Sequence, residues 1–296
     1  MRPQRVIAIV GPTAVGKSAF GVRLALAQNG EIVSADSRQV YRGLDIGSGK
    51  ITADEMRGVP HHLLDIADPT DIYTAYDCVR DGRAAILDIE SRGRVPIVVG
   101  GSGLYIDALL GRVHLDHGAP DPELRARLAL LSLPELLAEL EERDPRAFQA
   151  VDHKNPRRVM RALERVGMHT PTEPPPYEVT WIGLTLPREV LLDRIRVRLQ
   201  ERLAHGMLEE ARTLHEKGLS YERMESLGLE YRFLARYLSG ALSYDAMSHE
   251  LMREIGKFAR RQMTWFKRNK EISWFDAQTV TPQEVLASAS SSSESR

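Results

Sequence analysis

The stretch RVIAIVGPTAVGKS, residues 5–18, decides the fold of this chain. Its first half contains a continuous apolar run, residues 6–10, which predicts a buried strand of a parallel sheet. Residues 11–18 then follow the pattern G-x-x-x-x-G-K-S, in which successive backbone N–H groups point at phosphate oxygens. A chance glycine loop is the alternative, but the complete pattern lies between a predicted strand and a predicted helix. We therefore expect a phosphate-binding loop.

Each residue type in this loop has a physical role. Gly11 and Gly16 allow the backbone to curl tightly, and the N-terminus of the following helix favours an anion. Lys17 adds a positive charge, and Ser18 offers a hydroxyl to Mg²⁺. The pattern does not specify which phosphate compound is bound, and a nucleotide is only the default. The residues predicted to surround the phosphates are Gly11, Pro12, Thr13, Ala14, Val15, Gly16, Lys17 and Ser18.

The composition is ordinary for a soluble globular protein, with 43% apolar and 27% charged residues among 296. The net charge is −1, so binding to nucleic acid would require local basic patches. Cys78 is the only cysteine, which excludes an intrachain disulfide and a cysteine-built zinc site. We expect no membrane span and no signal peptide, because no apolar run is long enough and the N-terminus enters a strand almost at once. A cytoplasmic enzyme is expected.

Strands and helices alternate along the first part of the chain. Apolar runs at residues 32–35, 94–99 and 179–186 predict further buried strands, and a helix is expected at residues 73–92. Such alternation implies an α/β fold, a parallel sheet flanked by helices with right-handed crossovers. Two adjacent histidines at residues 61–62 would point to opposite faces of a short strand, so a shared metal site is not expected.

Polar or glycine-rich segments follow these strands. The segment DSRQ, residues 36–39, lies at the sheet edge where open α/β folds bind ligands. We interpret it as a substrate-reading loop beside the phosphate site, and a polar loop with an aspartate N-cap is the alternative. The turn at residues 100–105 is either a second anion-facing helix N-terminus or a turn built for close packing. GLDIGSGK, residues 43–50, is a weak signal because glycine-rich surface loops are common.

The character of the chain changes near residue 115. A stretch rich in Pro, Asp and Gly marks a boundary there, and the proline-rich residues 170–176 mark another. We predict a helical insertion at residues 115–178, between the two parts of a core domain at residues 1–114 and 179–275. A basic helix within the insertion has either a solvated face or an RNA-binding face.

A long helix is predicted at residues 244–269. Its inner stripe, which includes Gln262 and Trp265, is expected to face the core, while positive charges line another face. Such a density of positive charge beside a phosphate loop suits a polyanionic ligand. Further along, the low-complexity residues 287–296 are predicted to be disordered.

Six motifs occur in an order that points to a family. They read GPTAVGKS, SADSRQVYRGLDIGSGK, HHLLDI, VGGSGLYI, RALERV and ARRQMTWFKR. Together they closely resemble the tRNA dimethylallyltransferase family of bacteria, over nearly the whole chain to about residue 275. The resemblance implies a P-loop NTPase-like core with an inserted all-helical tRNA-binding domain, usually in a monomer.

The resemblance also implies the reaction. The family transfers a dimethylallyl group from dimethylallyl diphosphate to the exocyclic amine of the adenosine 3′-adjacent to the anticodon. The loop would then hold a diphosphate leaving group rather than ATP. N–H donors, Lys17, Mg²⁺ near Ser18 and an arginine would stabilise the charge that develops on it. Arg232, in the segment EYR, is the arginine that we predict for this role.

In the family, the DSxQ segment reads the target base after it leaves the anticodon stack. Asp36 is then predicted to be the general base that accepts the proton from the amine. Ser102 stands where many relatives have Thr, keeps the hydroxyl, and is predicted to bond to substrate. The insertion would contact the anticodon stem-loop. The predicted tRNA-binding residues are Asp36, Ser37, Arg38, Gln39, Ser102, Arg125, Arg157, Arg158, Arg161, Lys257, Arg260 and Arg261.

Two other functions stay open at this point. A small-molecule kinase that uses ATP would share the fold and the loop but would leave the basic helices without a use. A phosphate-gated RNA-binding module would use those helices but would have little need for Asp36 beside the loop. Transfer or hydrolysis of ATP without RNA would favour the kinase, and loss of RNA binding on removal of nucleotide would favour the module.

Overall fold

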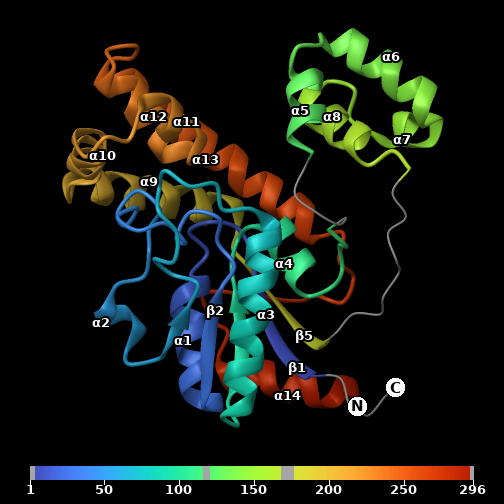
Figure 1. The fold of residues 1–296 in the computed structure, drawn as a ribbon. Helices are drawn as coiled ribbons and strands as arrows, with labels where there is room; N and C mark the ends of the chain where they lie inside the picture. The colour runs from blue at the N-terminus through green and yellow to red at the C-terminus, as the bar shows by residue number, and fades with distance from the viewer. Residues whose placement is uncertain (1–3, 116–120, 168–176, 294–296) are drawn as a thin grey trace. The chain divides into compact units, whose positions relative to one another are not determined.

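The computed structural model describes residues 4–115, 121–167 and 177–293 (Figure 1). The chain forms two compact units, one made of Met1–Val113 with Pro175–Arg296 and the other of His114–Pro174. The second unit corresponds to the insertion predicted at residues 115–178, although the sheet already resumes at Tyr177. Boundary stretches were predicted at residues 116–122 and 170–176, and of these residues 116–120 and 170–176 lie outside the described part of the chain.

The first unit is built on a parallel sheet, which confirms the predicted α/β fold. Among the described residues the sheet has six strands in the order β3-β2-β4-β1-β5-β6, and every pairing is parallel. In the centre, Ile7 lies beside Ile97 and Ile9 lies beside Ile182. The strands are β1 (Gln4–Val10), β2 (Gly30–Ser34), β3 (His61–His62), β4 (Val95–Val99), β5 (Tyr177–Thr185) and β6 (Ser273–Asp276). The short edge strand β6 was not expected from the sequence.

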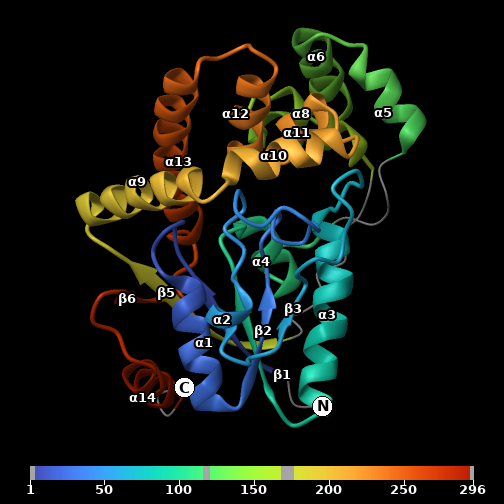
Figure 2. The ribbon, with the colours of Figure 1, turned by 90° about the vertical axis from the view of Figure 1, so that its left-hand side faces the viewer.

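Helices cover both faces of this sheet, with α1 and α3 on opposite sides of it (Figure 2). Successive side chains of a strand point to opposite faces. Val6 and Ala8 therefore share one apolar cluster with α3 and α4, while Ile9 shares another with α1. The helices in the first part of this unit are α1 (Lys17–Gln28), α2 (Ala53–Met56), α3 (Ala75–Ser91) and α4 (Gly103–Leu109).

A layer of helices lies beyond the carboxyl ends of the strands (Figure 2). It has its own apolar cluster, to which Tyr41 and Leu44 from the segment after β2 also belong. Helix α13 crosses the layer, and its inner residues Leu251 and Ile255 are buried as its spacing predicts. The layer consists of α9 (Arg188–Ala204), α10 (Met207–Glu216), α11 (Tyr221–Ser226), α12 (Leu229–Leu238) and α13 (Tyr244–Phe266). Ligand-binding loops at this edge of the sheet are therefore partly covered.

The C-terminal residues correct one expectation. Residues 287–296 were predicted to be disordered, but helix α14 extends over Pro282–Ser293. Val285 is buried in the cluster that contains α1, and Thr281 and Glu284 exchange hydrogen bonds that begin the helix. This local capping and packing outweigh the low-complexity composition; residues 294–296 lie outside the described part. No helix in the described part of the chain is long and apolar enough to cross a membrane.

The second unit is helical and has its own core. Leu128, Leu140, Val159 and Leu163 are buried together, each at an inward position of its helix. Local signals begin the helices: an Asp or Asn N-cap with a following Pro in three of them, and a capping box at Ser132 in the other. The helices are α5 (Pro122–Ala129), α6 (Leu133–Arg143), α7 (Pro145–Ala150) and α8 (Pro156–Glu164).

Candidate active site

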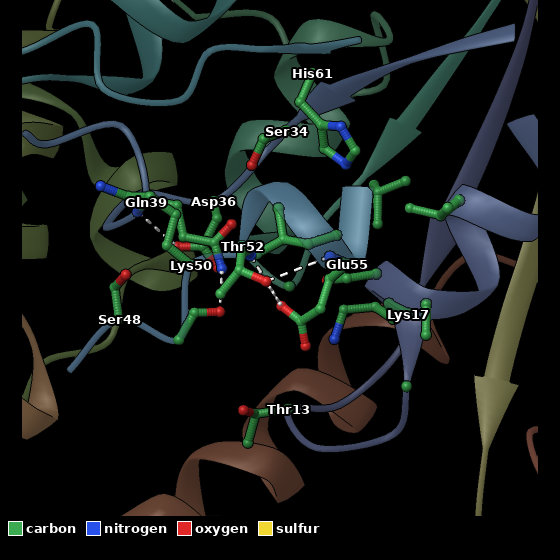
Figure 3. A pocket seen from close by; sticks show the side chains of 18 of the residues that line it. Thr13, Lys17, Ser34, Asp36, Gln39, Ser48, Lys50, Thr52, Glu55 and His61 are labelled. Carbon is green, nitrogen blue, oxygen red and sulfur yellow. Dashed lines mark hydrogen bonds between the residues drawn. The ribbon is translucent and has the colours of Figure 1, made fainter. Parts of the chain in front are cut away.

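A cavity of about 920 Å³ lies at the carboxyl edge of the sheet (Figure 3). The phosphate loop after β1 and the polar segment after β2 both contribute to its wall, together with α9. Lys17, Asp36 and Gln39 all line it, so the two segments singled out from the sequence meet in one site. Further lining residues are Thr13, Ser18, Asp45, Ile46, Gly49, Lys50, His61, Arg198 and Arg202.

The loop at residues 11–18 has the backbone that its glycines predict. Gly11 has φ +149°, and a Cβ there would lie 2.5 Å from the carbonyl oxygen of Leu184. Gly16 has φ +102° and is the N-cap of α1. The first turn of α1 contains no acidic side chain that would occupy the N-terminus of the helix. The loop is therefore suited to bind an anion from outside the chain.

Two partly buried cations lie beside this loop. Burial, followed by the charge of Arg198, lowers the pKa of Lys17 to about 7, although Asp36 acts in the opposite direction. Burial also lowers the pKa of Arg198 to about 10, and Arg202 adds to the effect. Since desolvation and mutual repulsion make these charges costly, an anion that enters the cavity is stabilised by both.

Gln262 of α13 connects the phosphate loop to the second glycine turn. Its Oε1 accepts a hydrogen bond from Thr13 N (2.8 Å), and its Nε2 donates to Gly101 O (2.9 Å). The side chain is only 6% exposed, so both amide groups are satisfied inside the protein. The spacing of apolar residues predicts Gln262 in the core stripe of its helix but gives no sign of this bridge, because the partners of Gln262 lie far away along the chain.

The segment after β2 forms a turn that presents two polar side chains. Asp36 Oδ1 accepts from Arg38 N (2.9 Å) and from Gln39 N (3.4 Å), which fixes one oxygen of the carboxylate. Gln39 Nε2 donates to Gly49 O (3.1 Å). Both side chains line the cavity that contains Lys17. Asp36 is therefore an oriented carboxylate within the same cavity as the phosphate loop.

Ser37, Arg38 and Ser102 are placed differently, because none of them is among the residues that line this cavity. Ser102 Oγ accepts from Ser37 N (3.1 Å) and also lies 3.3 Å from Ser37 Oγ. These bonds connect the ends of β2 and β4, where Gly100 lies so close that a Cβ would be 2.2 Å from Ala35 O. The turn at residues 100–105 thus has the close packing that was one of its two interpretations. A bond from Ser102 to substrate stays a prediction.

The arginine predicted for the phosphate site and the arginine that lines this cavity are different residues. The role predicted for Arg232 stays a prediction. Arg232 lies on α12, donates to Glu225 O (3.2 Å), and is not among the cavity-lining residues. Arg198 of α9 lines the cavity and donates to Thr13 Oγ1. Arg194 and Arg202 share this face of α9, one turn before and after, and the i, i+4 spacing was the only signal in the sequence.

The basic residues predicted to contact tRNA in the first unit lie on α13. Arg260 and Arg261 are exposed, and Lys257 is exposed and pairs with Glu254 (2.7 Å). These side chains lie on the outer part of the helix that carries Gln262 on its inner side. RNA contact by them stays a prediction.

In the second unit, two predicted arginines share one buried partner. Arg125 and Arg161 both pair with Glu164, at 2.8 and 2.9 Å, and Glu164 is only 5% exposed. This shared carboxylate connects α5 to α8. Arg157 and Arg158 are exposed on α8, and Arg158 pairs with Asp152 at 3.5 Å. The geometry therefore gives Arg125 and Arg161 a structural contact, whereas contact with RNA by any of the four stays a prediction.

The residues present can accommodate Mg²⁺ only together with a ligand. Ser18 is exposed in the cavity, but the described residues contain no group of three or more His, Cys, Asp or Glu side chains that could hold a metal ion. Mg²⁺ commonly binds through one or two protein oxygens, substrate phosphates and water, so this donor set fits a diphosphate-bound ion. His61 and His62 have separate partners, Val59 O and Glu31, as expected for adjacent strand residues.

Comparisons with known proteins agree with this geometry. Two family models match, one described as IPP transferase over residues 39–269 and one as isopentenyl transferase over residues 4–73. A tRNA dimethylallyltransferase of Thermomicrobium roseum is 44% identical over 282 residues, 92% of this chain and 86% of that protein. One of Halalkalibacterium halodurans is 38% identical over 94% of this chain and 92% of that protein.

Solved structures show the same similarity. A tRNA isopentenylpyrophosphate transferase of Bacillus halodurans superimposes with a TM-score of 0.74 at 38% identity, covering 96% of this chain and 94% of that one. A eukaryotic dimethylallyltransferase, captured acting on tRNA, superimposes with a TM-score of 0.80 at 25% identity, covering 93% of this chain and 74% of that one. This chain therefore belongs to the IPP transferase family, together with the tRNA dimethylallyltransferases.

Proposed function

We propose that this protein transfers the dimethylallyl group of dimethylallyl diphosphate to the exocyclic amine of the adenosine 3′-adjacent to the anticodon of tRNA. The products are N6-isopentenyladenosine and diphosphate. The observation that carries the proposal is the meeting of an anion-binding loop, two desolvated cations and an oriented carboxylate in one cavity.

The diphosphate would bind the loop at residues 11–18. The allylic carbon–oxygen bond breaks, and its electron pair leaves with the diphosphate while the carbon becomes cation-like. Lys17, Arg198 and the backbone N–H groups of the loop then stabilise charge where it develops. Mg²⁺, held by Ser18 and the diphosphate oxygens, would add to this stabilisation.

Asp36 would act on the other substrate. The amine nitrogen forms a bond to the allylic carbon and loses a proton, which Asp36 accepts as general base. One oxygen of Asp36 is held by Arg38 N and Gln39 N, so the carboxylate cannot turn away from the cavity without losing both hydrogen bonds. Gln39 would hydrogen-bond the target base beside it.

The basic side chains outside the cavity would position the RNA. Contacts to phosphates orient a nucleic acid without reading its sequence, and unpaired loop bases supply the specificity. In the first unit this surface is α13, with Lys257, Arg260 and Arg261. In the second unit it is α8, with Arg157 and Arg158, and there we propose contact with the anticodon stem-loop.

The test is transfer of label from radiolabelled dimethylallyl diphosphate to unmodified tRNA, with Mg²⁺ and without ATP. We expect incorporation at the adenosine beside the anticodon alone. Incorporation that requires ATP, or ATP consumption without RNA, would instead support the kinase. A folded protein that binds RNA but transfers no label from this donor would contradict the proposal.

A further inference from the structure

In the glycine-rich segment GLDIGSGK, residues 43–50, backbone N–H groups bind a side-chain carboxylate of the protein itself. Glu210 of α10 accepts three hydrogen bonds from consecutive backbone N–H groups of this segment. Oε2 accepts from Asp45 N (2.9 Å) and Ile46 N (2.7 Å), and Oε1 accepts from Gly47 N (2.9 Å). Consecutive N–H groups that converge in this way form a concave anion site. Glu210 therefore fixes the backbone of the segment at three successive residues.

Tyr231 of α12 completes the arrangement. Its hydroxyl donates to Glu210 Oε1 (2.6 Å), and its side chain is 1% exposed. Burial, and then the charge of Glu210, raises the pKa of Tyr231 well above its ordinary value, so the hydroxyl keeps its proton. A Cβ on Gly47 would lie 2.7 Å from the ring and hydroxyl of Tyr231, which explains the glycine at this position. Neither Glu210 nor Tyr231 is among the residues that line the cavity, so both hold the segment from outside it.

On its cavity side, the same segment contacts the candidate base-reading residue. Gly49 O accepts the hydrogen bond from Gln39 Nε2 at 3.1 Å, and both residues line the cavity. A glutamine amide carries a donor on one side and an acceptor on the other. The bond to Gly49 therefore fixes which side of the amide carries the oxygen.

This orientation matters for the choice of base. Adenine presents an amine donor where guanine presents a carbonyl acceptor. An amide that can rotate by half a turn loses this distinction, because it can offer either group to the base.

We propose that Glu210 is a positioning residue for base recognition: by holding residues 45–47 it places the Gly49 carbonyl, which orients the Gln39 amide and so favours adenosine over guanosine. The inference rests on the proposed function, in which an adenosine enters this cavity. Glu210 acts through the loop and touches neither substrate.

The experiment compares Glu210→Gln with the wild type and with Glu209→Gln. Glu209 is the exposed neighbour on α10 and pairs with Arg212, so its substitution keeps the same chemical change away from the loop. Three quantities are measured for each protein: the Kd of dimethylallyl diphosphate, the KM of an anticodon stem-loop RNA, and the Ki of the same RNA with guanosine at the target position.

In Glu210→Gln the amide oxygen can still accept hydrogen bonds, but the amide nitrogen would face at least one backbone N–H group, so the anchor of the loop is weakened. We expect the ratio of Ki for the guanosine RNA to KM for the adenosine RNA to fall about tenfold, with the Kd of the donor within about threefold of wild type. Tyr231→Phe removes one of the four hydrogen bonds and should lower the ratio about threefold. Glu209→Gln should match the wild type.

An unchanged ratio in folded Glu210→Gln would overturn the inference, and so would equal losses of donor and RNA affinity. If thermal denaturation shows that Glu210→Gln does not fold, Tyr231→Phe decides in its place, and an unchanged ratio there overturns the inference. A wild-type protein that transfers no label and does not prefer the adenosine RNA would mean that the proposed function has failed. A wild-type protein that transfers and discriminates, beside variants that discriminate equally well, would mean that only this inference has failed.

Discussion

Two glycine-rich segments of this chain contain a lysine, and the two differ in whether an acidic side chain of the protein lies against them. At residues 11–18 the helix N-terminus has no acidic side chain in its first turn, and Lys17 is desolvated beside Arg198. At residues 43–50 Glu210 occupies the backbone N–H groups, and Lys50 Nζ lies 2.5 Å from both Asp45 and Asp65. A glycine-and-lysine pattern therefore supplies donors in both places. We infer that the N–H groups of such a segment are left for an anionic ligand only where no carboxylate of the chain itself occupies them.

The largest expected difference is between the two lysines. Lys17→Met should lower kcat/KM for dimethylallyl diphosphate about 10³-fold, because it removes a cation from the place where negative charge develops. Lys50→Met should leave the Kd of the donor within about threefold of wild type, since two carboxylates already neutralise this lysine. Steady-state transfer and titration calorimetry measure both quantities. Equal losses of kcat/KM, or of affinity for the donor, in the two variants would contradict the distinction between the segments.

The next largest difference separates two arginines. Arg198→Met should lower kcat/KM for the donor about 10²-fold, because Arg198 lines the cavity beside Lys17. Arg232→Met should change it by less than about threefold, because Arg232 lies outside the cavity. The same transfer assay on both variants gives the comparison. A larger loss of kcat/KM in Arg232→Met than in Arg198→Met would instead support Arg232, the arginine predicted from the sequence.

The binding of an anion at residues 11–18 should depend on pH, and the dependence should differ between the wild type and Lys17→Arg. The pKa of Lys17 in the protein without ligand is about 7, and a bound diphosphate raises this pKa. Above pH 7 the complex therefore holds more protons than the protein without ligand. The Kd of diphosphate should then increase about tenfold between pH 7 and pH 8.5. In Lys17→Arg the side chain stays charged, and the Kd should be nearly flat over this range. A flat wild-type curve measured by calorimetry would show that Lys17 does not titrate here.

The smallest predicted effect is on stability, and its sign separates the two lysines. The lowered pKa of Lys17 means that its charge is less favourable in the folded protein at pH 7, so Lys17→Met should not lower the free energy of unfolding. Lys50→Met should lower it by about 1 kcal/mol, a modest loss because the partner carboxylates are half exposed. Urea denaturation at pH 7 measures both. A fall with Lys17→Met as large as that with Lys50→Met would contradict this expectation.

Local patterns explain which parts of the site could be predicted from the sequence. The strand and loop at residues 5–18 and the polar segment at residues 36–39 carry their signals within a few residues. Both follow strands of one parallel sheet, so their meeting at one edge follows from the fold class. The α/β fold and the separate helical unit could be predicted for the same reason.

The remaining parts depend on contacts between distant residues. Arg198 is one of several arginines on α9, and only packing decides which of them enters the cavity. Gln262 meets Thr13 across 249 positions, and Glu210 meets Asp45 across 165. No local spacing encodes such pairs. Strand β6 and helix α14 were missed because packing against β5 and α1 stabilises short or polar segments.

The central claim is that the cavity holds a diphosphate at the loop and a general base at Asp36. The most direct test is the single-turnover rate of Asp36→Asn with saturating donor and anticodon stem-loop RNA. Asparagine keeps the oxygen that accepts from Arg38 N and Gln39 N, so the turn is preserved while the base is removed. We expect the rate to fall about 10²-fold or more, with the Kd of donor and of RNA unchanged. A rate close to wild type, or a loss of RNA affinity as large as the loss of rate, would contradict the role of Asp36 as general base.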